Sequence, residues 1–262
     1  MEARAWQERL YRHSLMKKEK VRLLAKRIDF NDKKIFDLGC SAGAVSYQLK
    51  KRGGHWLHAD LDLEILRAAK ELLGNDLVQV SPDSLPCKNG AFDLILALDF
   101  LEHVENDSLT TAEAARLLKN GGRIALSTPI HNGFFLLNRL KKFLGLKPEL
   151  YGHRRQGYSL QDLNDLLHRH GFTVEYAGTY AKFFVELCET LLNWLYVKKE
   201  HPANRQRSGH ISPSSRADMD RSRTWFNIYS VFVYPFVYLL TRFDRLLWFK
   251  TGYATLVIGR KT

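Results

Sequence analysis

The sequence predicts an α/β fold, a doubly wound Rossmann-like sheet with helices on both faces. Apolar segments of strand length alternate with segments of helical periodicity from residue 34 to residue 128, which is typical of a parallel sheet. The glycine-rich turn Asp37-Leu38-Gly39-Cys40-Ser41-Ala42-Gly43 lies directly between the first predicted strand and a helix. In such sheets a ligand binds at this turn, where the strand ends and the helix begins.

The elements alternate regularly along the first half of the chain. The first thirty residues are predicted to form a single basic helix that ends before Asn31. Strands are then expected at residues 34–38, 55–60, 77–80, 92–98 and 123–128, with helices at 44–51, 63–73 and 109–118. This order predicts a parallel sheet covered on both faces.

Further elements of the sheet follow residue 158. Ser159 and Asp162 form a capping box that begins a helix, and Gly171 ends that helix. A strand at 172–176 comes next, and residues 253–259 are predicted to rejoin the sheet as its last strand.

The segment from residue 181 to residue 251 departs from this alternation. A helix is predicted at 182–199 and a polar loop at 198–223, and Trp225 to Leu240 is apolar on nearly all sides. That apolar stretch is shorter than the ~20 residues that cross a bilayer, and basic residues flank it: Arg221, Arg223, Arg242, Arg245 and Lys250. Aromatic and basic side chains together are typical of a segment that lies in the headgroup region of a membrane, here over residues 225–249. The alternative is a helix pair packed on its own domain or on a second copy in a homodimer.

The net charge of +12 is concentrated at the two ends of the chain. Residues 1–27 carry +6 and residues 195–262 carry +8, whereas residues 28–194 carry −2. A nucleic-acid enzyme usually lines its catalytic cleft with positive charge, so nucleic acid is not the expected partner. The basic ends are expected to meet an anionic surface or to keep the chain soluble.

The cysteines and the first residues indicate the compartment. Cys40, Cys87 and Cys188 form no close pair, which argues against a disulfide scaffold and a zinc module, and no metal is expected. The first fifteen residues lack the apolar segment of a secretory signal. We therefore expect a reduced, cytoplasmic compartment, with a peripheral position on the inner face of a membrane if the insert binds lipid.

A second cofactor signal is Asp60, at the end of the second predicted strand. A carboxylate there can accept two hydrogen bonds from ribose hydroxyls, which suits any adenosine-bearing cofactor. Several other segments accompany it in a fixed order: His58-Ala59-Asp60-Leu61-Asp62, Asp83-Ser84-Leu85-Pro86, Ala91-Phe92-Asp93-Leu94-Ile95, Leu101-Glu102-His103-Val104, Leu118-Lys119-Asn120-Gly121-Gly122-Arg123, Ser127-Thr128-Pro129 and Gly152-His153. On these motifs the chain resembles class I S-adenosylmethionine (SAM)-dependent methyltransferases, in particular the type 11 group that includes the ubiquinone and menaquinone methyltransferases.

The resemblance implies a seven-stranded sheet whose last strand is antiparallel. Residues 181–251 would then form a helical insert between the sixth and seventh strands, where the family core has only a short hairpin. It also implies SAM as the cofactor, held by residues of the turn and of the ends of the next strands: Asp37, Gly39, Cys40, Ser41, Gly43, Asp60, Leu61, Ser81, Asp83 and Asp99. Ser41 replaces the middle glycine of the family turn, and Ser81 stands where the family often has an Asp near the adenine. Cys40 is interpreted as a packing side chain and not as a nucleophile.

Methyl transfer from a sulfonium is an in-line displacement in which positioning of the acceptor supplies most of the rate. A general base is needed only for a hydroxyl or an acidic carbon. The candidates for this role are His103, His131 and His153, and Tyr158 is a candidate for orienting the acceptor. A surface, loop or packing role is the alternative for each histidine.

The chain is therefore divided into four predicted parts: an N-terminal basic helix at 1–30, a SAM-binding methyltransferase domain at 31–180, a helical apolar and basic insert at 181–251, and the last strand of the sheet at 252–262. The predicted function is methyl transfer to a small or amphipathic acceptor, lipid-like or lipid-linked, such as a quinone precursor or a glycolipid. Two alternatives stay open: an RNA methyltransferase, and a non-catalytic scaffold that keeps the cofactor fold.

Overall fold

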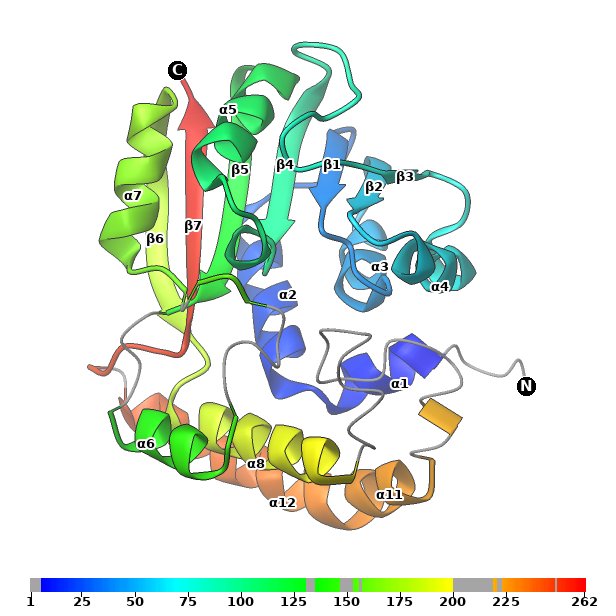
Figure 1. Cartoon of the computed structure of the whole chain (residues 1–262), viewed down its shortest axis with the longest axis vertical. Helices are drawn as coiled ribbons and strands as arrows, with labels where there is room; N and C mark the ends of the chain where they lie inside the picture. The colour runs from blue at the N-terminus through cyan, green and yellow to red at the C-terminus, as the bar shows by residue number, and fades with distance from the viewer. Residues whose placement is uncertain are drawn as a thin grey trace.

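A seven-stranded sheet with the order β3-β2-β1-β4-β5-β7-β6 forms the centre of the computed structural model (Figure 1). The structure describes residues 6–130, 135–146, 153–155, 157–199, 219–220, 223–247 and 249–262. The strands are β1 (Lys34–Leu38), β2 (His55–Asp60), β3 (Leu77–Gln79), β4 (Phe92–Leu98), β5 (Leu118–Pro129), β6 (Phe172–Tyr180) and β7 (Ala254–Lys261). β7 lies between β5 and β6 and is antiparallel to both, whereas the pairs β1–β2, β2–β3, β1–β4 and β4–β5 are parallel. The predicted fold class, with its antiparallel last strand, is confirmed.

Helices cover both faces of this sheet. Those of the first part of the chain are α1 (Trp6–His13), α2 (Leu15–Arg27), α3 (Ala44–Lys50), α4 (Leu63–Leu73), the 3-10 turn η1 (Leu101–His103), α5 (Asp107–Leu117), α6 (Phe135–Phe143) and α7 (Leu160–Arg169). One core cluster joins the sheet to α5 and α7, and a second, on the other face, joins it to α2, α3 and the start of α8. The near-continuous apolar runs of β1 and β4 fit strands that are buried on both faces.

Local signals in the sequence place several of these elements. The Asp62 side chain caps α4 by accepting hydrogen bonds from the backbone N–H of Glu64 and Ile65, and Gly74 ends the helix. The predicted capping box of Ser159 and Asp162 is present at the start of α7. β6 is longer than predicted, because its second half is paired with β7, which lies far away in the sequence. β5 begins earlier than predicted, and its first residue, Leu118, is paired with Phe92 of β4.

The N-terminal segment differs from the single helix that was expected. It forms two helices, and Ser14 breaks them apart in an extended conformation and accepts a hydrogen bond from the Lys17 N–H as the N-cap of α2. Helix α6 was also not expected. It packs against α8, and Lys141 of α6 forms an ion pair with the buried Glu186 of α8.

The insert between β6 and β7 is helical where the structure describes it. It consists of α8 (Phe183–Lys199), α11 (Arg223–Ile228), the π-helical turn η3 (Tyr229–Val233), α12 (Tyr234–Leu240) and the 3-10 turn η4 (Thr241–Leu247). Together with α6 these helices form a layer beyond the carboxyl ends of the parallel strands, and α2 lies between that layer and the sheet (Figure 1). Among the described residues, no helix is long and apolar enough to cross a membrane.

Candidate functional site

The glycine-rich turn follows β1 directly and has the backbone that only glycine adopts easily. Gly39 and Gly43 have φ angles of +83° and +85°. A Cβ atom at Gly39 would lie 2.6 Å from Cδ2 of Phe100, and one at Gly43 would lie 3.0 Å from Cγ of Leu73. Both glycines are therefore required by their backbone conformation and by their neighbours, and Gly43 is also the N-cap of α3.

Asp60, at the end of β2, connects the glycine-rich turn to the loop that follows β2. One carboxylate oxygen accepts a hydrogen bond from the Ser41 N–H at 2.8 Å, and the other accepts one from the Asp62 N–H at 3.2 Å. The N–H groups of Gly39 and Cys40 donate to the Ala59 carbonyl at 2.8 and 2.9 Å. The structure thus brings the predicted Gly39, Ser41 and Asp60 together at one edge of the sheet.

Asp37 is the buried support of the turn. Its side chain is 3% exposed, and Oδ2 lies 2.8 Å from Nδ1 of His58, whose ring is fully buried and stacked on Trp56. His58 was not singled out as a site residue, although its place two positions before Asp60 marks it. Both side chains are buried within the sheet, so Asp37 supports the glycine-rich turn from the sheet interior.

The remaining predicted cofactor residues lie around this turn. Cys40 is buried against Leu66, Ala69 and Leu73, and burial raises the pKa of its thiol, in keeping with its interpretation as a packing side chain. Leu61 is half-buried and packs against the main core cluster. Ser81 and Asp83 are exposed in the turn after β3, where the Ser84 N–H donates to the Ser81 carbonyl at 3.2 Å.

Asp99 follows β4 in a strained conformation with a φ of +53°, and its N–H donates to the Ser127 carbonyl at 2.7 Å. Such strain in a residue other than glycine persists only where the surroundings enforce it, and it is common at functional sites. Its carboxylate forms a short ion pair with Lys20 of α2 and accepts a 3.3 Å hydrogen bond from the Ser127 hydroxyl. Ser127 in turn lies 2.8 Å from the hydroxyl of the buried Tyr180.

Lys20 was missed by the sequence interpretation, which assigned the basic residues of the first helix to contact with an anionic surface or to solubility. Its side chain is only 4% exposed. Burial by itself would lower the pKa of Lys20, but the adjacent Asp99 carboxylate outweighs burial and the pKa is raised. The ammonium therefore stays charged, and α2 is anchored at the carboxyl end of β4.

Glu102, His103 and His153 form a cluster next to Asp99. Each offers one ligand atom, and these atoms lie within 4.8 Å of one another. The rings of His103 and His153 meet edge to face at 5.0 Å, and the Arg154 N–H donates to the Glu102 carbonyl at 2.9 Å. The cluster has a donor set that can bind a cation. The sequence spacing did not reveal it, because His153 is distant from the other two residues in the chain.

Burial sets the protonation of this cluster. Among the described residues neither carboxylate oxygen of Glu102 has a hydrogen-bond partner, and burial, reinforced by Asp99, raises the pKa of Glu102 well above its usual value. Burial, reinforced by His103, lowers the pKa of His153 to about 4. At neutral pH His153 is therefore uncharged, and burial makes it a weaker base than an ordinary histidine.

The other two candidates differ in position. Tyr158 is 5% exposed, and its hydroxyl lies 2.8 Å from Asp107 and 3.3 Å from the Leu101 carbonyl, to both of which it can donate. These contacts hold the start of α7 against η1 and α5. His131 lies outside the described residues.

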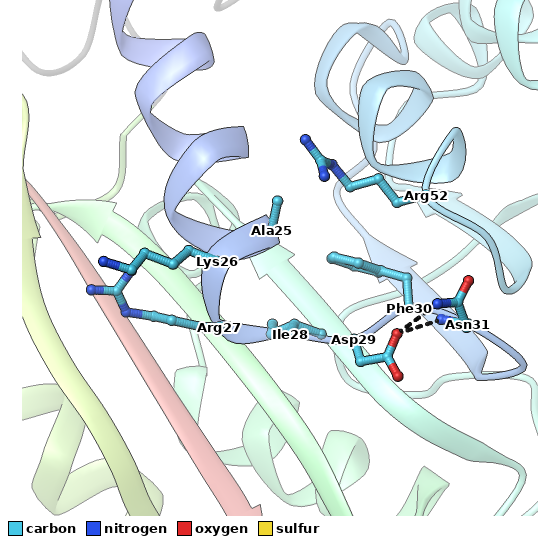
Figure 2. Close-up of a pocket in the computed structure, with 8 residues that line it drawn as sticks. All are labelled: Ala25, Lys26, Arg27, Ile28, Asp29, Phe30, Asn31 and Arg52. Atoms are coloured by element: carbon cyan, nitrogen blue, oxygen red, sulfur yellow. Dashed lines mark hydrogen bonds between the residues drawn. The ribbon is translucent and has the colours of Figure 1, made fainter.

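A surface depression of about 470 Å³ lies away from these residues (Figure 2). It is lined by the end of α2 and the loop that leads into β1, with Lys26, Arg52 and Asn31 among its residues. The Asp29 carboxylate accepts hydrogen bonds from the Asn31 backbone and side chain at 3.1 and 3.0 Å. This depression is at the amino end of β1, opposite to the glycine-rich turn.

Comparison with known proteins agrees with the geometry. A model of the methyltransferase domain matches residues 36–126, from β1 to β5. A ubiquinone biosynthesis O-methyltransferase of Xylella fastidiosa is 31% identical over 112 residues, which are 40% of this chain and 45% of that protein. The chain thus spans about half the length of the curated relatives it matches.

Solved structures share the fold at low sequence identity. A candidate methyltransferase of Bacillus halodurans has a TM-score of 0.59 and 17% identity, over 93% of this chain and 99% of its own. A SAM-dependent methyltransferase of Thermotoga maritima, suggested to be a histamine N-methyltransferase, has a TM-score of 0.61 and 16% identity, over 97% of this chain and 94% of its own. The fold implied by the sequence motifs is therefore present over the whole sheet.

Proposed function

Because the chain carries a class I SAM-dependent methyltransferase domain, we propose that it transfers the methyl group of SAM to an amphipathic acceptor, lipid-like or lipid-linked. The observation that carries the proposal is the turn after β1. Gly39 and Gly43 leave no room for a Cβ atom, and Asp60 presents its carboxylate beside the turn. This cradle fits the backbone approach and the ribose of an adenosine-bearing cofactor.

SAM supplies an activated methyl group when it is bound. The residues that would hold it are those of the turn and Asp60, with Ser81 and Asp83 near the adenine. The task of the protein is to fix the acceptor in line with that methyl group and to exclude water. Asp99 and Lys20 form their ion pair at the carboxyl end of β4, on the same edge of the sheet as the glycine-rich turn.

Proton transfer is assigned to the neighbouring cluster. When the acceptor is a hydroxyl group, the oxygen–carbon bond would form as the sulfur–methyl bond of SAM breaks, the neutral thioether would leave, and the proton must leave the oxygen. His103 and His153 are the groups proposed to accept it, because their rings meet edge to face at the carboxyl edge of the sheet, next to Asp99. Asp99 lies near the pair, and its charge favours the protonated form of His153, so it can stabilise the imidazolium that results.

The acceptor class is supported by the helical insert. Exposed apolar side chains cover η3, α12 and η4, in the layer that lies across the carboxyl ends of the parallel strands. The Xylella fastidiosa relative is named for ubiquinone biosynthesis, so a quinone precursor is the first candidate, with a glycolipid as the second.

The experiment is incubation of the full chain with methyl-labelled SAM and three separate extracts: total membrane lipid, RNA and aqueous metabolites. The expected result is label in the organic phase of the lipid extract, lost in an Asp60→Asn variant that still folds. Label confined to RNA or to the aqueous extract would refute the lipid-like acceptor. Absence of label together with absence of SAM binding in calorimetry would refute the methyltransferase itself.

A further inference from the structure

The helices of the insert expose an unusual number of large apolar side chains on one segment. We call these residues the apolar face: Val231, Phe232, Phe236, Leu239, Phe243 and Leu246, which are between 54% and 74% exposed. They come from η3, α12 and η4, which follow one another without a break. Exposed apolar surface of this kind on a folded chain marks a surface that another molecule covers.

The opposite side of the same segment is firmly attached to the protein. Val237 is buried, and the carboxylate of Asp244 accepts hydrogen bonds from the N–H groups of Phe184 and Val185 at 2.8 and 3.0 Å. The Lys18 side chain of α2 donates to the Tyr234 hydroxyl at 2.6 Å. One side of the segment is therefore packed on the domain, and the apolar face is the opposite, exposed side.

The charge around the apolar face is positive. Arg223, Arg242 and Lys250 are exposed beside it. From residue 223 to residue 250 the sequence has one acidic residue, Asp244, which is buried under α8. An anionic surface would thus meet basic side chains and no exposed carboxylate of this segment.

We propose that the apolar face docks on the surface of an anionic lipid bilayer. Aromatic and aliphatic side chains would enter the boundary between headgroups and acyl chains, and the arginine and lysine side chains would contact lipid phosphates. The segment lies along the surface, in agreement with the lack of a membrane-crossing helix among the described residues.

A bilayer fits this surface better than a second copy of the chain does. A two-fold contact through the apolar face would place the basic residues of one copy against those of the other, in a chain whose net charge is +12. Anionic lipid supplies the opposite charge and has no register to match. The docked layer would also turn the carboxyl edge of the sheet, with its glycine-rich turn, toward the bilayer (Figure 1).

The test is co-sedimentation of the full chain with phosphatidylcholine vesicles that contain a quarter of phosphatidylglycerol, and with pure phosphatidylcholine vesicles. We expect binding to the anionic vesicles that weakens with salt and is at least about tenfold weaker on the neutral ones. A Phe232→Glu/Phe236→Glu variant is expected to lose at least about tenfold in vesicle affinity. The control is Leu109→Glu, which places one glutamate at an exposed apolar position on α5, away from the apolar face.

Two results would overturn the proposal. One is equal sedimentation of the unmodified chain with anionic, neutral and no vesicles, a comparison that needs no variant. The other is a dimer in light scattering that the Phe232→Glu/Phe236→Glu change converts to a monomer, because a second copy would then cover the apolar face. SAM binding of the same samples is measured in parallel, so that failure of docking and failure of the proposed function are distinguished.

Discussion

Asp60 connects the two loops at the carboxyl edge of the sheet, where its carboxylate accepts hydrogen bonds from the N–H groups of Ser41 and Asp62. The Asp60→Asn change removes the charge and keeps the shape. Charge-assisted hydrogen bonds contribute about 1.5–3 kcal/mol, so SAM affinity should fall roughly tenfold to hundredfold. Isothermal titration calorimetry measures this directly.

The matched control for this change is Asp76→Asn. Asp76 is an exposed carboxylate just before β3, at the other end of the strands. Its replacement should leave SAM affinity within about twofold of the unmodified chain, as is usual for surface substitutions. Equal affinities of the Asp60→Asn and Asp76→Asn variants would remove Asp60 from the cofactor site.

His153 is expected to make the stability of the protein dependent on pH. Burial, reinforced by His103, lowers its pKa to about 4 in the folded chain, against about 6.5 for an unperturbed histidine. Between these two values the unfolded chain binds more protons, so folding becomes less favourable as the pH falls through this window. A His153→Gln variant should lose less stability than the unmodified chain between about pH 6.5 and pH 4.

Urea unfolding at about pH 7, 6 and 5 measures this difference, with the exposed His168→Gln as the control. Glu102, whose pKa is raised, acts in the opposite direction, and it is present in all three proteins. If the unfolding free energies of the unmodified chain and of His153→Gln fall equally with pH, a lowered pKa of His153 in the folded chain is contradicted.

At the scale of elements, helix α8 begins on a cap that comes from a distant part of the chain. Asp244 of η4 is buried and accepts hydrogen bonds from the N–H groups of Phe184 and Val185 in the first turn of α8. The Asp244→Ala change leaves both donors without this acceptor, which should cost about 2 kcal/mol of unfolding free energy. Denaturant unfolding gives the value.

Asp244→Asn is the companion variant, because its amide oxygen still accepts one hydrogen bond. We expect it to cost less than half as much as Asp244→Ala. A loss of equal size in both variants would show that the charge of Asp244, and not its role as a cap, stabilises the insert.

In the N-terminal segment the sequence predicted helix correctly but missed the break that divides it into two helices. Their basic, partly apolar pattern predicts helix, and helix is present on both sides of Ser14. The break arises because Ser14 caps α2 and donates through its hydroxyl to Glu189 of α8 at 3.1 Å. A contact 175 positions away leaves no mark on the local periodicity.

At the scale of the whole molecule, β7 joins β6 to the rest of the sheet. It pairs along its length with β5 on one side and β6 on the other, from Arg123 to Pro129 and from Phe172 to Tyr180. Removing residues 254–262 would leave two strand edges unpaired and open both core clusters, to which β7 contributes. We expect the shortened chain to be insoluble or unfolded by circular dichroism.

Removal of Thr262 alone is the control, since it is exposed and its loss takes away only hydrogen bonds to the Gly171 carbonyl. The unfolding free energy of that chain should lie within about 1 kcal/mol of the value for the full chain. A soluble, folded chain that lacks residues 254–262 would show that the sheet does not need its last strand.

The sequence by itself determined the alternation of strands and helices, the glycine-rich turn and the acid at the end of β2. These are local properties, because backbone conformation and burial repeat over a few residues and glycine is needed wherever φ is positive. The order of family motifs added the antiparallel last strand and the cofactor. Gly39, Ser41 and Asp60 could be named in advance because they lie in these local motifs.

Only the tertiary structure decided which distant side chains meet. Lys20 pairs with Asp99 across 79 positions, and His153 lies with Glu102 and His103 although about fifty positions separate them. The sequence patterns of these residues equally fit a solvated charge or a loop histidine. Their burial, and with it their protonation, arises from packing between elements that are far apart in the chain, and this is where sequence periodicity carries no information.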